Sequence, residues 1–464
     1  MSTTKLLIAL VTTCALLGSN PVAAGWHSEA LLASDENVRW GMPVGAIAGE
    51  SNAIVAWTTL GATGSNMVVR RWDGADWLAE EEIDAGDEEV DDPKVSMAPD
   101  GQAVVVWSQS DGSAVRVYAN CWNGTAWSGA TIIDGRYGGY YVELVMAPSG
   151  IAMAYWTHVD DISYEHTIYM SRWSGSEWSE PTAAPAESDV VHLAVNDAGE
   201  VALASEADSD PDDFIRVALW DGSAWTASET ISRAPAVSAP AVGIHADGRA
   251  TLVWAQGDAT GAVYTSRWDG SSWSNPEALT EEGMVSTPAI AVDASGRAVT
   301  AWGLAGENSI EIHARVLNDG VWGIAKVLGT SEGLPDKRIM LRQSAGIPRV
   351  LMDAGGNALV YWLGSDGSKF GNYSSRWDGT RWSGAHRVGG GENDALNFSA
   401  AMDADGRAIG VWSQEAAYDV DVRAAFYTPG DESETGGAGS EGFALGLLLI
   451  LVAMRASRRE HRRR

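Results

Sequence analysis

Hydrophobic residues recur along this chain in short alternating runs separated by turn residues, and the arrangement returns about every 50 residues. Each unit begins with a short alternating strand such as Pro240–Ile244, followed by a turn rich in Asp and Gly. An apolar strand ending in Trp comes next, as in Ala103–Trp107. A third strand such as Val263–Trp268 leads through a tight turn to a fourth, which is predicted to begin near Trp273. Period-two alternation, β-branched residues and paired turn signals predict four β-strands per unit.

The tryptophans mark this repeat, because all but Trp40 of the 22 fall into three registers. The first register ends the second strand: Trp57, Trp107, Trp156, Trp254, Trp302, Trp362 and Trp412. The second ends the third strand: Trp72, Trp122, Trp173, Trp220, Trp268 and Trp377. The third usually follows five residues later: Trp26, Trp77, Trp127, Trp178, Trp225, Trp273, Trp322 and Trp382. We assign structural roles to the first and third registers, because indoles bury a large area and pack neighbouring sheets.

Four short strands per repeat predict an all-β fold, an eight-bladed β-propeller of four-stranded antiparallel blades. The ends of the repeat region support closure of the ring. An unpaired fourth strand is expected at Trp26–Leu32, and an unpaired set of first, second and third strands at Phe398–Tyr427. Pairing these two segments completes the last blade and removes the exposed edges. Two blades are degenerate, with Ala204-Ser205 and Leu317 at tryptophan positions.

The residue immediately before the second-register tryptophan also follows the repeat. Arginine precedes the second-register tryptophan at Arg71, Arg172, Arg267 and Arg376. Such recurrence predicts a structural contact between blades, in which arginine stacks on an aromatic ring or pairs with a turn carboxylate. Cys121 stands at the same position, and we interpret it as packed and inert.

The repeat resembles that of secreted, tryptophan-rich bacterial repeat proteins. The motif Asp-x-x-Gly-x-Ala-x-x-x-Trp-x-Gln is carried by Asp403–Gln414, and Arg-Trp followed by Trp-Ser by Arg267–Ser274. The resemblance covers residues 25–428 and implies a propeller without implying an activity. The stretch Trp268–Trp273 is also loosely similar to the Asp-boxes of sialidase-like propellers, but it is one residue shorter and lacks the leading Ser.

Composition narrows the function classes. The fractions of hydrophobic and charged residues, 45% and 20%, argue against long-range disorder. The formal net charge of −31 disfavours nucleic acid as a partner, because an acidic surface repels phosphates. Cys14 lies in the leader, so Cys121 alone remains in the body and no intramolecular disulfide is expected.

Both ends of the chain are predicted to be targeting segments. Residues 1–24 combine Lys5, an apolar run over Leu6–Leu17 and a small-residue cleavage site ending at Ala24, which predicts a signal peptide. The propeller is therefore expected to be exported, to the cell surface, the outer membrane or the medium.

The C-terminal end has three parts. Residues 429–441 form an acidic Gly/Ser linker that contains Gly436 and Gly437, and residues 442–464 hold the apolar run Phe443–Met454 before a series of arginines. This tail resembles the GlyGly-CTERM sorting signals of Gram-negative bacteria, which implies export and tail-processing machinery as partners. A plain C-terminal membrane anchor, a transmembrane helix of which Phe443–Met454 is the apolar part, is the alternative. In either case the tail is the only expected membrane contact.

No catalytic residue is assigned, because the chain has no metalloprotease, P-loop, serine-hydrolase or zinc-site motif. Asp208, Asp210 and Asp212 have the spacing that opens a calcium loop. Asp213 and Leu219 replace the expected Gly and Glu, so a solvated acidic loop is the favoured interpretation and no cofactor is predicted beyond this weak calcium candidate.

The loops before each first strand and between each second and third strand vary most, and long loops on a regular scaffold are candidates for function. The ligand-binding candidates on them are Tyr137, Tyr140, Tyr141, His158, Asp160, Asp161, Lys337, Arg338 and Arg342. Tyrosines beside carboxylates suit a sugar. We therefore expect a non-enzymatic binding or scaffold propeller for a glycan or protein ligand. The alternatives are a glycoside hydrolase or lyase with carboxylates at the channel mouth, and an acidic surface-coat protein.

Overall fold

The computed structural model describes residues 25–430 apart from short gaps. The gaps are 36–37, 39–42, 62–63, 87, 136–137, 161–162, 164, 187–189, 208–211, 235, 238–239, 258–260, 333–346, 392 and 416–418. The predicted signal peptide and C-terminal tail lie outside the described residues. Within those residues, no helix has the length and apolar character needed to cross a membrane.

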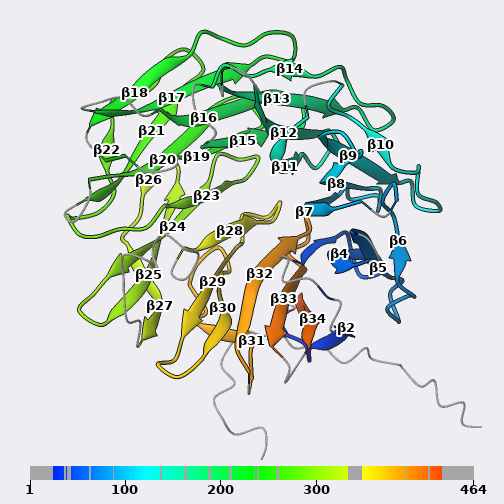
Figure 1. The fold of residues 1–464 in the computed structure, drawn as a ribbon. Helices are drawn as coiled ribbons and strands as arrows, with labels where there is room; N and C mark the ends of the chain where they lie inside the picture. The colour runs from blue at the N-terminus through cyan, green and yellow to red at the C-terminus, as the bar shows by residue number, and fades with distance from the viewer. Residues whose placement is uncertain are drawn as a thin grey trace, which may run out of the picture. The chain divides into compact units, whose positions relative to one another are not determined.

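Residues Trp26–Tyr427 form one compact unit, an all-β propeller of eight four-stranded antiparallel blades (Figure 1). The predicted fold class is confirmed. In each blade the strands follow one another outward, and the first strands of neighbouring blades lie side by side around a central channel. We call the side with the loops between second and third strands the loop face, and the side with the turns between first and second strands the turn face.

The first four blades span residues 44–234. Blade 1 contains β3 (Val44–Ile47), β4 (Ala53–Leu60), β5 (Ser65–Trp72) and β6 (Glu81–Glu82). Blade 2 contains β7 (Val90–Met97), β8 (Ala103–Ser110), β9 (Val115–Trp122) and β10 (Thr131–Ile132). Blade 3 contains β11 (Tyr140–Met146), β12 (Ala152–Val159), β13 (His166–Trp173) and β14 (Thr182–Ala183). Blade 4 contains β15 (Val191–Val195), β16 (Val201–Ala207), β17 (Asp213–Trp220) and β18 (Glu229–Ala234).

The remaining blades complete the ring. Blade 5 contains β19 (Ala241–Ile244), β20 (Ala250–Gln256), β21 (Ala262–Trp268) and β22 (Glu277–Ala278). Blade 6 contains β23 (Ala289–Val292), β24 (Ala298–Ala305), β25 (Ser309–Asn318), β26 (Val321–Trp322) and β27 (Lys326–Glu332). Blade 7 contains β28 (Arg349–Met352), β29 (Ala358–Ser365), β30 (Phe370–Trp377) and β31 (His386–Gly389). Blade 8 contains β32 (Ala395–Met402), β33 (Ala408–Glu415), β34 (Val420–Thr428) and, from the other end of the chain, β1 (Gly25–Trp26) and β2 (Ala30–Asp35).

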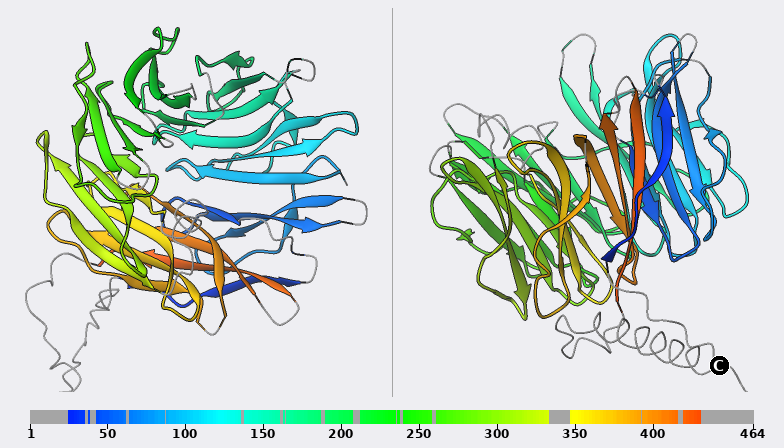
Figure 2. Two further views of the ribbon diagram at one scale, coloured as in Figure 1. Left: turned by 60° about the vertical axis from the view of Figure 1, so that its left-hand side comes forward. Right: turned by 90° about the horizontal axis from the view of Figure 1, so that it is seen from below.

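The two ends of the repeat region pair as predicted. Strand β2 runs antiparallel to β34, with Ala30 opposite Ala424 and Ser34 opposite Asp421. Figure 2 shows the blue N-terminal strand beside the orange C-terminal strands. Arg423 adds an ion pair with Glu29 at 2.8 Å. The ring is thus closed by backbone hydrogen bonds, which leaves no free edge on β34.

First-register tryptophans form the core between blades. All seven are at most 2% exposed. The glutamine of the Trp-x-Gln motif has a structural role, because the indole nitrogen of Trp107 donates to Gln109 Oε1 at 2.9 Å. Trp412 donates to Gln414 in the same way at 3.3 Å. The motif therefore satisfies a buried N–H that would otherwise be costly.

In six blades the fourth strand begins later than the sequence predicts, whereas β26 and β1 contain Trp322 and Trp26 as expected. Trp273 forms an isolated bridge with Trp268, and the strand itself is Glu277–Ala278. The reason lies in the preceding turn, where Asp269 Oδ1 accepts hydrogen bonds from the backbone N–H groups of Ser271 and Ser272 at 2.8 and 2.9 Å. This tight turn brings the two indoles to 5.9 Å between ring centroids before the chain pairs again with the third strand.

Candidate functional site

One layer of the channel wall, on the loop-face side, carries an unusual set of charged side chains. The position thirteen residues before each first-register tryptophan lies on the first strand of its blade, as Lys94 precedes Trp107 and Arg349 precedes Trp362. The strand register places it identically in every blade. Its eight occupants in blade order are Val44, Lys94, Glu143, His192, Ala241, Ala289, Arg349 and Ser399.

The backbone beside this layer departs from regular geometry in blades 2, 3 and 8. Asp92, Tyr141 and Asn397 have positive φ values of 56°, 54° and 54°. Each lies at a shift of register between the first and second strands. Left-handed geometry in a non-glycine residue costs energy, and bulges of this kind can re-aim a side chain next to a functional site. Here each distorted residue lies two positions before a residue of the layer.

Lys94 is held between two carboxylates. Its ammonium group forms ion pairs with Asp92 on its own strand and with Glu143 Oε1 of blade 3, the latter at 3.6 Å. The Lys94 side chain is 18% exposed, whereas those of Asp92 and Glu143 are 28% and 49% exposed. The positive charge of Lys94 is therefore already matched within the protein.

Glu143 has a perturbed acidity. Desolvation by the channel wall raises the pKa of its carboxyl group above the ordinary value, and the charge of Lys94 opposes this effect. Tyr155 lies directly across from Glu143 on β12, and its own pKa is raised by burial and by the Glu143 charge. A half-exposed carboxyl group with a raised pKa can donate a hydrogen bond as well as accept one.

His192 is neutral in this layer at physiological pH. Burial and the nearby charge of Arg349 lower its pKa to about 4. Its Nδ1 atom accepts a hydrogen bond from the backbone N–H of Val242 in blade 5 at 3.3 Å. The backbone contact defines this nitrogen as the acceptor, so a neutral imidazole suits the site.

Arg349 faces this group from blade 7, which lies opposite blade 3 in the ring of eight. It is exposed, and its side chain forms no ion pair or hydrogen bond with any residue that the structure describes. Its charge lowers the pKa of both Glu143 and His192, so it acts electrostatically across the channel. Tyr361 lies across from it on β29, and the ring of Tyr361 packs against Phe398 at 5.1 Å.

The channel below contains a cavity of about 380 Å³ between the first strands of blades 1, 2, 3, 7 and 8. Lys94 is the one charged residue among those that line it, and the other walls are small or apolar, including Leu144 and Leu351. The charged layer therefore borders a cavity whose walls, apart from Lys94, are uncharged.

Four of the predicted ligand-binding residues are described, and they lie around blade 3. Tyr140 and Tyr141 begin β11 and are 50% and 70% exposed. The Nδ1 atom of His158, on β12, lies 2.8 Å from the carbonyl oxygen of Gly138, and its ring packs edge-on against Tyr169. Asp160 accepts a hydrogen bond from the backbone N–H of Ser163 at 2.8 Å, so it stabilises its own loop. The two tyrosines stand beside Glu143, which places them at the rim of the charged layer.

The remaining candidates lie largely outside the described residues. These are Tyr137, Asp161, Lys337, Arg338, Arg342, Asp208 and Asp210. The third residue of the calcium candidate, Asp212, pairs with Arg233 at 3.1 Å. Within the described part of the chain no group of three or more His, Cys, Asp or Glu side chains could hold a metal ion.

The charged layer was not predicted from the sequence. The signal was present in the constant spacing to the first-register tryptophan, but the first strands look unremarkable one at a time. Three polar residues in consecutive blades and one in the opposite blade become a site only when the ring closes.

No protein-family model matches the chain, and no curated protein matches it. Solved structures resemble it in fold. The polysaccharide lyase Uly1 is 9% identical with a TM-score of 0.48, covering 87% of this chain and 99% of its own. A protein of unknown function from Dyadobacter fermentans is 12% identical with a TM-score of 0.38, covering 86% and 98%. The Aleuria aurantia lectin, solved with Fucα1-6GlcNAc, is 15% identical with a TM-score of 0.37, covering 64% and 95%. These low scores carry no weight in assigning an activity.

Proposed function

We propose that the chain is an exported propeller that binds an anionic glycan at the loop-face mouth of its channel. The observation that carries this proposal is that Arg349 is exposed, pairs with no residue that the structure describes, and lies opposite the Lys94–Glu143 pair. In a protein with a net charge of −31, a channel mouth that presents an exposed guanidinium group favours one negative group on the ligand.

The chemistry of the layer suits a sugar that carries a carboxylate. A guanidinium group binds a carboxylate through two parallel hydrogen bonds, which fixes its orientation. Glu143 can accept or donate to a hydroxyl, because its pKa is raised. The exposed rings of Tyr140 and Tyr141 offer faces on which a pyranose ring can stack.

The test is a panel of immobilised oligosaccharides with neutral, uronate-bearing and sialate-bearing members, probed with the full chain with and without calcium. We expect binding to acidic members only and no dependence on calcium. Arg349→Ala should weaken that binding at least tenfold, and Tyr141→Ala should weaken it several-fold.

The matched control is Arg381→Ala. Arg381 lies in a turn between a third and a fourth strand, on the turn face, and its side chain is 68% exposed, so its removal changes the net charge equally without touching the channel mouth. Equal losses of affinity in the two variants would show that the effect comes from net charge alone. Absence of binding to every glycan would contradict the proposal and favour a protein ligand or a surface-coat role.

A second candidate function, glycan cleavage, is favoured by one observation. Asp92 and Glu143 both contact Lys94, so two carboxyl groups lie close together at the channel mouth, and one has a raised pKa. Against it, neither carboxyl is buried and Lys94 lies between them. Incubating each bound oligosaccharide with the protein and with Glu143→Gln distinguishes the two: new reducing or unsaturated ends formed by the parent protein alone would establish catalysis.

A further inference from the structure

A repeating contact joins the blades near the turn face. At several junctions the residue before the second-register aromatic residue of one blade lies against the equivalent aromatic residue of the next blade. The guanidinium carbon of Arg71 lies 4.0 Å from the ring centroid of Trp122. Arg376 repeats the arrangement over Tyr427 at 5.5 Å, and its Nη1 atom donates to the tyrosine hydroxyl at 3.1 Å.

Apolar side chains take the same place at other junctions. Phe426 of blade 8 lies 5.2 Å from Trp72 of blade 1 between ring centroids. Leu219 packs in one cluster with Trp268, and Val316 packs in one cluster with Trp377. The rule common to these junctions is that a side chain of one blade covers an aromatic ring of the next.

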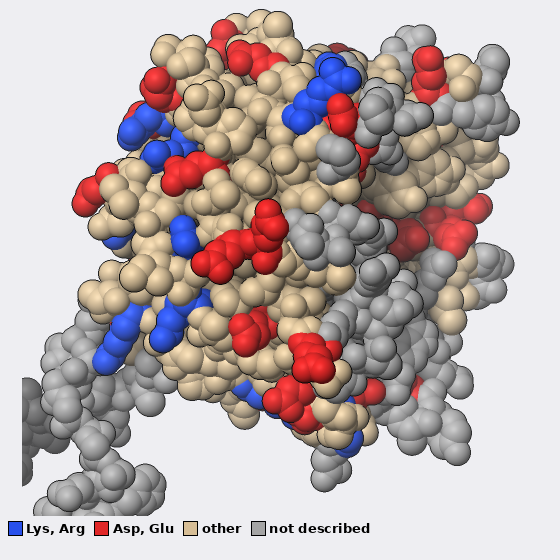
Figure 3. Space-filling model, turned by 90° about the vertical axis from the view of Figure 1, so that its left-hand side faces the viewer, with Lys and Arg blue, Asp and Glu red and all other residues tan. Residues whose placement is uncertain are grey.

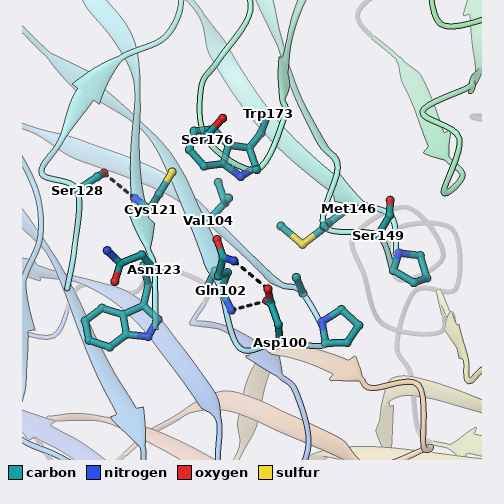
Figure 4. Close-up of a pocket in the computed structure, with 17 residues that line it drawn as sticks. Asp100, Gln102, Val104, Cys121, Asn123, Ser128, Met146, Ser149, Trp173 and Ser176 are labelled. Atoms are coloured by element: carbon teal, nitrogen blue, oxygen red, sulfur yellow. Dashed lines mark hydrogen bonds between the residues drawn. The ribbon is translucent and has the colours of Figure 1, made fainter. Parts of the chain in front are cut away.

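The covering side chain is smaller at the junction between blades 2 and 3. Cys121 occupies this position and packs in one cluster with Trp173. A cavity of about 430 Å³ lined by Cys121, Trp122 and Trp173 lies at this junction. Figure 4 shows Cys121 and Trp173 with Val104 and Met146 around this space. The volume is within the range of about 300–1,000 Å³ that is usual for ligand sites. No cation of the described residues lies over Trp173, although Arg71 covers the equivalent Trp122.

The cavity is acidic at its edge. Asp100 is the only charged residue among those that line it, and it accepts hydrogen bonds from the backbone and side-chain nitrogens of Gln102 at 3.0 and 2.8 Å. Nearby, Asp197 of blade 4 accepts a hydrogen bond from the N–H of Ser149, a lining residue, at 2.8 Å. On the side seen in Figure 3, acidic and basic side chains are interspersed.

We propose that this cavity binds the guanidinium group of an arginine on a protein partner, stacked on Trp173 as Arg71 is stacked on Trp122. An indole face with a nearby carboxylate attracts a planar cation, and the attraction grows when water is displaced. An anion would meet Asp100 without any compensating positive charge. The partner's arginine would supply the contact that Cys121 cannot make.

The test uses N-acetyl-arginine amide as the probe and N-acetyl-citrulline amide as its uncharged counterpart, titrated calorimetrically into the full chain. We expect the arginine probe to bind at least ten times more tightly. Asp100→Asn, which keeps the shape of the side chain, should weaken arginine binding several-fold and leave citrulline unchanged.

The decisive variant is Cys121→Arg, which supplies the missing side chain from within. It should abolish probe binding while the variant melts at or above the temperature of the parent protein. Ile324→Arg adds the same charge at a residue that is 94% exposed and should leave probe binding intact. Equal affinity for the two probes, or undiminished binding to folded Cys121→Arg, would overturn the proposal. If Cys121→Arg does not fold, unchanged arginine binding to Asp100→Asn would overturn it instead.

Discussion

The guanidinium group of Arg71 lies between the ring of Trp122, 4.0 Å from its centroid, and the carboxylate of Glu81, which it reaches at 2.6 Å. The first contact crosses from blade 1 to blade 2, and the second remains within blade 1. One side chain therefore joins two sheets through its flat face while its edge is neutralised by its own blade. Lysine has no planar group that could lie flat on the ring while its edge binds the carboxylate.

Arg71→Ala should lower the free energy of unfolding by about 1–2 kcal/mol, through loss of the stacking and of partly buried packing. Arg71→Lys should recover less than half of this. Chemical denaturation measures both values. Arg381→Ala, in an exposed turn, should stay within about 0.5 kcal/mol of the parent protein. A comparable loss at Arg381 would mean that the cost reflects charge and not stacking.

Removal of residues 25–35 should open the ring. Strand β34 would lose its outer partner and expose unpaired N–H and C=O groups, which promote association between chains. We expect oligomers in light scattering and a lower melting temperature. The milder Leu32→Ala, at a residue 5% exposed, should cost about 2–5 kcal/mol while the protein remains monomeric. A shortened chain that stays monomeric and melts like the parent would contradict the role given to this closure.

His192 should make stability depend on pH. Because its pKa is about 4 in the folded chain and 6.5 in its ordinary state, the unfolded chain binds a proton first as pH falls. Its contribution is complete above pH 6.5 and is lost towards pH 4. When the pH falls from 6.5 to 4, the parent should therefore lose about 1–3 kcal/mol more stability than His192→Gln.

The comparison isolates His192, since Glu143 acts in the opposite sense in both proteins. The pKa of Glu143 is raised, so the stability associated with it falls as pH rises. Denaturation midpoints measured from pH 4 to pH 7 provide the profile. Parallel profiles for the two proteins would rule out a buried neutral imidazole.

Cys121 should be a slow thiol. Burial raises its pKa to about 11, so little thiolate is present at pH 8. Alkylation by iodoacetamide should be at least tenfold slower in the folded chain than in urea at that pH, and it should accelerate as pH approaches 11. Fast labelling of the folded chain at pH 8 would show a different environment for the sulfur.

Local patterns determined the architecture. The three tryptophan registers, the Asp-Gly turns and the unpaired strands at each end were enough to predict eight four-stranded blades and their closure, because each blade is specified by its own 50-residue sequence. Where prediction erred, as in the start of the fourth strands, the turn at Asp269 imposed a geometry that alternation alone does not encode.

Tertiary structure decided where chemistry can occur. Lys94, Glu143, His192 and Arg349 are separated by up to 255 residues, and only ring closure brings blades 3 and 7 to opposite sides of one channel. The cavity between Cys121 and Trp173 is equally invisible in the sequence of blade 2, because Trp173 belongs to blade 3. Strands are formed by neighbours in sequence, whereas charge and cavities depend on neighbours in space.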